Sequence, residues 1–90
     1  MRAPRLPRWW GWPLDFPDHV RERMRHRNFS ETDVRHMLFL VRRVRPMMED
    51  PCRWSVDSEL DGIPWRIILE PVPAERVVVV VTAYQLAPPP

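Results

Sequence analysis

The sequence predicts an α+β protein in which two N-terminal helices pack on a three- to four-stranded antiparallel sheet. Two patterns support this fold: residues 17–41 carry apolar side chains at helical spacing, and residues 53–70 alternate between apolar and polar side chains as strands do. A chain of 90 residues has room for one domain with a modest core. We assign residues 15–86 to that domain, between an Arg-, Trp- and Pro-rich segment over residues 1–14 and a Pro-rich tail over residues 87–90.

The first helix is expected where Phe16, Val20 and Met24 recur every four positions and form a narrow apolar stripe. Pro17 suits the start of this helix, because its backbone angle is already helical and it has no N–H to leave unpaired. The side chains that can exchange protons or bind phosphate lie along one border of the stripe: His19, Arg23, His26 and Arg27.

The second helix has a clear start at Ser30, whose hydroxyl can accept a hydrogen bond from the backbone N–H of Asp33. Phe29 and Val34 flank this cap at the spacing of a hydrophobic staple, which sets the angle at which the chain enters the helix. Asn28, between the two helices, suits a left-handed backbone conformation. The buried face of the second helix then consists of Val34, Met37, Leu38 and Val41.

The strands follow the helices. Residues 42–48 predict a first strand, which Pro46 restricts to the edge of the sheet. Asp61 and Gly62 form a strong two-residue hairpin signal. Folding at this turn predicts one register, with Leu60 opposite Ile63, Val56 opposite Ile67, Trp54 opposite Leu69, Asp57 opposite Arg66 and Arg53 opposite Glu70. Residues 76–84 are too continuously apolar for an edge strand, so we expect a central strand covered by the helices.

The charge of the chain comes from arginine alone: the formal net charge is +2, and all fourteen cations are Arg. Guanidinium groups bind phosphate in a planar, bidentate way, but a GC-rich coding sequence also explains this composition. Cys52 is the single cysteine, which excludes a disulfide framework and suits a reducing cytoplasm. No apolar run reaches the length that spans a membrane, and no secretory signal is evident at the N-terminus.

The N-terminal segment places three tryptophans, Trp9, Trp10 and Trp12, directly after three arginines. Such a segment can stack on bases, lie at a membrane surface or hold a protein partner. Alternatively, its tryptophans fold back and cover the core, since large aromatic side chains left in water promote association. We expect at least one of the three to pack on the domain, and residues 1–7 and 87–90 to be mobile.

The stretch HVRERMRHRNFSETDV and the closing VVVVVTAY resemble the DUF4258 family. The resemblance covers residues 18–84, with Asn28 in place of a common glycine and an unusual Pro-rich loop before Arg76. It implies the fold of the barnase–EndoU–colicin–RelE group of small ribonucleases, many of them toxins. The residues that match are His19, Arg23, Met24, Arg27, Phe29, Ser30, Asp33, Val34, Thr82, Ala83 and Tyr84.

These residues suggest a metal-independent ribonuclease, which needs a base, an acid and a cation at the phosphate. The candidate catalytic residues are His19, Arg23, Thr82 and Tyr84, and the candidate RNA-binding residues are Arg27, His26 and Arg66. If the hypothesis holds, the Thr82 and Tyr84 end of the last strand must lie near His19. No metal-ligand signature and no glycine-rich phosphate loop occurs, so we expect no metal and no cofactor.

Other interpretations fit the same residues. His19 can instead be held by a neighbouring carbonyl, with Arg23 and Arg27 in ion pairs along the seam between helix and sheet. The chain is then a non-catalytic module that binds RNA or a protein, or an accessory domain that its arginines keep soluble. For the ribonuclease, the expected partners are RNA and a small antitoxin or another protein; a membrane is not expected.

Overall fold

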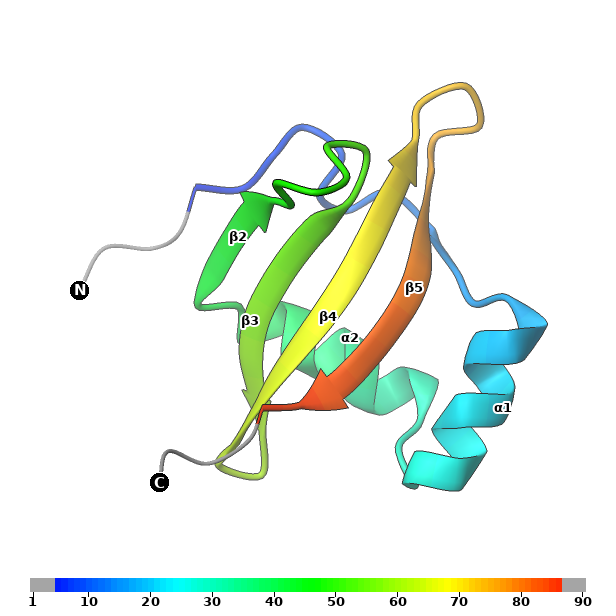
Figure 1. Cartoon of the computed structure of the whole chain (residues 1–90), viewed down its shortest axis with the longest axis vertical. Coiled ribbons are helices and arrows are strands. Elements are labelled where there is room, and N and C mark those ends of the chain that lie inside the picture. The colour runs from blue at the N-terminus through cyan, green and yellow to red at the C-terminus, as the bar shows by residue number, and fades with distance from the viewer. Residues whose placement is uncertain (1–4, 87–90) are drawn as a thin grey trace.

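The computed structural model describes residues 5–86, which form two helices and one five-stranded sheet (Figure 1). In chain order the elements are β1 (Leu14–Asp15), α1 (Asp18–Arg27), α2 (Glu31–Phe39), β2 (Arg43–Pro46), β3 (Trp54–Leu60), β4 (Ile63–Val72) and β5 (Val77–Gln85). The strand order is β1-β5-β4-β3-β2. The predicted α+β class with two helices is confirmed, but the sheet has five strands rather than three or four. It is also mixed, because β1 pairs with β5 in parallel while the other pairs are antiparallel.

The predicted hairpin between β3 and β4 is confirmed in its register, with Val56 opposite Ile67 and Asp57 opposite Arg66. The turn residues Asp61 and Gly62 both have positive φ, 51° and 79°, as the favoured two-residue hairpin turn requires. Because a slip of one residue would expose the apolar face of both strands, this register also determines which side of the sheet carries the core.

The expected junction between the two helices is confirmed, although α2 ends at Phe39, before Val41, which was expected on its buried face. The Ser30 hydroxyl accepts from the Asp33 N–H at 3.1 Å, and the Asp33 carboxylate accepts from the Ser30 N–H at 2.8 Å, so a complete capping box begins α2. Asn28 ends α1 in the left-handed conformation, with φ 60° and ψ 47°. These local devices direct the chain from α1 into α2 without a long loop.

The N-terminal segment packs on the domain, as expected. Trp9 is only 8% exposed and belongs to the core, where its ring lies edge-on to Trp54 with 5.3 Å between the ring centroids. Further along, the Val78 N–H donates to the Pro13 carbonyl at 2.9 Å, and β1 continues this pairing along β5. Mobility was expected for residues 1–7 and 87–90, and of these, residues 1–4 and 87–90 lie outside the described residues.

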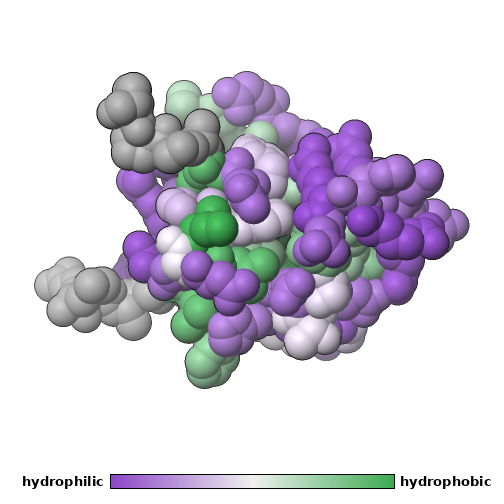
Figure 2. Space-filling model, turned by 90° about the horizontal axis from the view of Figure 1, so that it is seen from below, coloured by the Kyte–Doolittle hydropathy of each residue, from purple (hydrophilic) through white to green (hydrophobic). Residues whose placement is uncertain are grey.

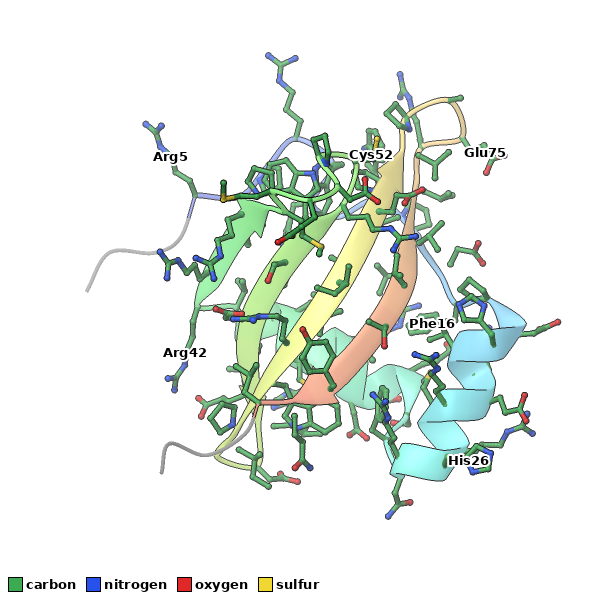
Figure 3. The ribbon with its side chains drawn as sticks, in the orientation of Figure 1. Arg5, Phe16, His26, Arg42, Cys52 and Glu75 are labelled. Atoms are coloured by element: carbon green, nitrogen blue, oxygen red, sulfur yellow. The ribbon has the colours of Figure 1, made fainter. Side chains whose placement is uncertain are left out.

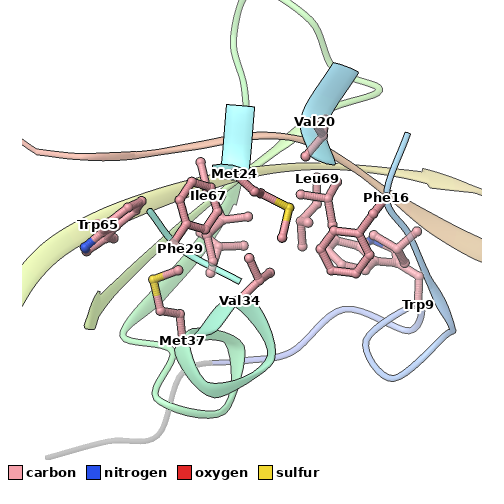
Figure 4. Packing of buried hydrophobic residues seen from close by; sticks show 14 residues of the cluster. Trp9, Phe16, Val20, Met24, Phe29, Val34, Met37, Trp65, Ile67 and Leu69 are labelled. Atoms are coloured by element: carbon pink, nitrogen blue, oxygen red, sulfur yellow. The ribbon is translucent and has the colours of Figure 1, made fainter. Parts of the chain in front are cut away.

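The core lies between the helices and one face of the sheet (Figure 4). Val34 and Met37 of α2 are fully buried, as are Val56 and Ile67 in the middle of the sheet. All eight residues predicted to share one core lie in it or pack against it: Val20, Met24, Val34, Leu38, Trp54, Val56, Ile67 and Leu69. Because α2 covers one face, the opposite face of β2–β5 is left without a helix, and we call it the open face.

Candidate functional site

A bulge in β5 places Tyr84 on the open face. Thr82 lies opposite Ile68, whereas Val80 lies opposite Leu69, so the chain holds one extra residue, Val81, between them. Strict alternation would have left Thr82 and Tyr84 on the same face as the buried Val80. The extra residue reverses the facing of the strand beyond it. Thr82 and Tyr84 therefore point away from the core.

Asp57, Arg66 and Tyr84 lie side by side across β3, β4 and β5 on this open face. The Arg66 Nε donates to an Asp57 carboxylate oxygen at 2.7 Å, and both side chains are partly buried. Hydrogen bonding to Asp57, and to a smaller extent to Tyr84, raises the pKa of Arg66 above its ordinary value, although partial burial opposes this shift. A permanent positive charge is thus held beside the Tyr84 hydroxyl.

Two side chains of this row, Arg66 and Tyr84, line a hollow of about 380 Å³. Its walls come from β2 with the loop that follows and from the open face: Arg45, Pro46, Met47, Met48, Glu49, Ser55, Arg66, Ile68 and Tyr84. Arg45 and Glu49 were not among the predicted site residues. The alternation of Arg43, Val44 and Arg45 did indicate that Arg45 faces away from the core, but the loop that carries Glu49 has no such pattern.

A second hollow, of about 360 Å³, shares Tyr84 with the first and is lined by Arg27, Trp65, Tyr84 and Gln85. Here the Arg27 Nη1 donates to the Ala83 carbonyl at 2.9 Å, which joins the end of α1 to β5. Tyr84 is therefore common to both hollows. Three predicted residues are thus brought together: Arg66 lies beside Tyr84 in the first hollow, and Arg27 lies beside it in the second.

His19 and Arg23 lie on the same row of α1 as Arg27, but eight and four positions earlier. At about 1.5 Å per residue, His19 is roughly 12 Å from Arg27 along the helix axis. The Tyr84 end of β5 lies at Arg27, so the expectation that it lies near His19 is wrong. Both His19 and Arg23 are exposed, and neither side chain makes a hydrogen bond or an ion pair to any residue of the described range.

His26 also lies apart from Tyr84. It is exposed, with its Nε2 4.0 Å from a Glu22 carboxylate oxygen, and Figure 3 shows it on the side of α1 turned away from β5. Figure 2 shows how hydrophilic side chains cover this end of the molecule over α1. His26 and His19 are thus part of a charged outer surface rather than of the hollows beside Tyr84.

Residues 5–86 contain no group of three or more His, Cys, Asp or Glu side chains arranged to hold a metal ion. No helix among them is both long enough and apolar enough to cross a membrane.

Comparison with known proteins adds no relative. No family model matches the chain, and neither a curated protein nor a solved structure is significantly similar to it. The resemblance to the DUF4258 family therefore rests on the short motifs quoted above.

Proposed function

We propose that this protein binds single-stranded RNA across Tyr84 and cleaves it without a metal ion. One observation carries the proposal: Tyr84 lines two hollows, whose linings also include an arginine from each of three elements, Arg45 from β2, Arg66 from β4 and Arg27 from α1. Guanidinium groups are the preferred side chains for phosphate, and an aromatic ring between them offers a base a surface to stack on. Consecutive phosphates of one strand can therefore be held on either side of Tyr84.

Cleavage in this arrangement follows the general route for metal-free ribonucleases. The ribose 2′-oxygen attacks the adjacent phosphorus, the bond to the 5′-oxygen breaks, and a 2′,3′-cyclic phosphate forms. Glu49, the one carboxylate in the lining of the larger hollow, takes the proton from the 2′-hydroxyl. Tyr84 gives a proton to the departing 5′-oxygen, while Arg66 and Arg45 stabilise the charge that develops on the phosphate. Arg23 and His19, nearer the start of α1, bind RNA at a distance from the bond that is cleaved.

The resemblance to the DUF4258 family supports the same proposal, since that family is similar to small ribonucleases of the RelE-like group. As a toxin-like ribonuclease the protein would act in the cytoplasm, and a small antitoxin is its proposed protein partner. The single exposed Cys52 suits that reducing compartment.

A non-catalytic RNA-binding module is the second candidate. It is favoured by the position of the histidines: neither His19 nor His26 lines a hollow beside Tyr84. Imidazole is the commonest proton carrier at neutral pH, so its absence from these hollows removes the most effective acid or base. This candidate uses the same arginines and the same surface.

A cleavage assay in a chelator distinguishes the two. We expect the protein to cut a fluorescently labelled single-stranded RNA in the presence of EDTA and to leave products with 2′,3′-cyclic phosphate ends. The DNA strand of the same sequence is the control, because it lacks the attacking hydroxyl and must stay intact. RNA that is bound but uncut would support the binding module, and RNA that is neither bound nor cut would overturn both candidates.

A further inference from the structure

We infer that a second site, on the helix side of the sheet, binds a small planar aromatic anion such as an aryl carboxylate. The site is a hollow of about 300 Å³ between the N-terminal segment and α2, with β4 and β5 at its base. Its principal lining residues are Trp9, Trp10, Trp12, Arg35, Leu38 and Phe39. None of them lines the hollows beside Tyr84, so this inference is independent of the proposed RNA surface.

The walls of this hollow favour an aromatic ligand. Three indole rings line it, and Phe39, at the end of α2, is 84% exposed beside them. A phenylalanine so exposed leaves apolar surface in water, and a flat ring bound in the hollow would cover it. Indole and phenyl rings stack on such a ligand or meet its edge, which adds to the gain from buried area. The volume is at the lower end for a ligand pocket, which suits one or two fused rings.

The charge of the lining favours a negative charge on that ligand. Arg35 is the one charged side chain that lines the hollow, and no carboxylate in the described residues pairs with it. An anionic group on the ligand would supply the partner that this guanidinium lacks.

Arg35 also indicates where the charge of the ligand would lie. Its guanidinium carbon is 5.9 Å from the centre of the Phe16 ring, which holds the cation over that ring. A carboxylate placed beside it can accept two hydrogen bonds from the guanidinium. The apolar rings then enclose the remainder of the ligand.

Two probes of equal size test the charge requirement: naphthalene-2-carboxylate and its neutral amide, naphthalene-2-carboxamide. The chain has five tryptophans, whose indole N–H signals can be followed separately by ¹⁵N NMR. We expect the carboxylate to shift the signals of Trp9, Trp10 and Trp12, while the signal of Trp65, outside the hollow, stays in place. The amide should bind at least about fivefold more weakly, since it loses the charge-assisted bond.

Arg35→Gln and Arg25→Gln form a matched pair of variants, because both arginines are exposed on helices and only Arg35 lines the hollow. Arg35→Gln should weaken carboxylate binding about tenfold and leave amide binding unchanged. A tenfold loss of affinity is at the lower end of what the removal of a hydrogen bond to a charged group costs. Arg25→Gln should change neither. Equal binding of the two probes, an equal loss in both variants, or no shift of the three indole signals at millimolar probe would overturn the inference.

Discussion

Replacing Tyr84 by phenylalanine should lower the rate of RNA cleavage at least about a hundredfold, which is the usual contribution of a positioned proton donor. The change removes one hydroxyl and keeps the ring, so base stacking and the half-buried packing of the side chain are preserved. RNA affinity should therefore change little. Single-turnover cleavage in EDTA measures the rate, and fluorescence anisotropy of a labelled RNA measures the affinity.

Thr82→Val is the matched control for Tyr84→Phe. It also removes one hydroxyl from the open face of β5, but Thr82 lines neither hollow beside Tyr84. His19→Ala adds a second comparison, because the sequence hypothesis makes His19 the acid or base, whereas its position on α1 separates it from Tyr84. Full activity of Tyr84→Phe, or loss of activity in Thr82→Val or His19→Ala alone, would contradict the proposed chemistry.

Trp9→Ala should destabilise the fold by about 3–5 kcal/mol, as truncation of a large buried aromatic side chain does. Trp9 packs against Trp54 and Phe16 in the core cluster, although it lies outside every predicted helix and strand. Urea denaturation followed by circular dichroism measures the change in unfolding free energy. The variant keeps the whole chain, so the result reports on packing and not on the removal of a segment.

Trp12→Ala provides the comparison for Trp9→Ala within the same segment. Trp12 is half-buried and packs at the margin of the core, so its truncation should cost clearly less. If Trp9→Ala stayed within about 0.5 kcal/mol of the wild type, the range typical of surface substitutions, the segment would not be part of the core.

The helices and the β3–β4 hairpin could be predicted because neighbouring residues determine them. The Ser30 cap, Asn28 and the Asp61–Gly62 turn each act over a few positions. In the hairpin of β3 and β4, the apolar face and the polar face both predict the same strand register. In contrast, β1 has only two residues, too few for any periodicity. It becomes a strand only because the edge of β5 is available to it.

The candidate site was predictable in its residue types but not in its arrangement. The sequence indicated Arg27, Arg66 and Tyr84, yet it placed His19 with them. Figure 1 shows α1 and β5 running in the same direction, so the C-terminal ends of the two elements meet. This orientation, like the extra residue Val81 that turns Tyr84 to the open face, depends on tertiary packing rather than on local pattern.

The central claim is that RNA lies across Tyr84, and an NMR titration tests it most directly. The titrant is a 2′-O-methyl oligoribonucleotide, which cannot be cleaved because its 2′-oxygen cannot attack. The account predicts the largest amide shifts at Arg45, Arg66, Tyr84 and Arg27, and binding that weakens steeply as salt rises. Shifts confined to α2 and the tryptophan segment, or no shifts at low salt, would contradict it.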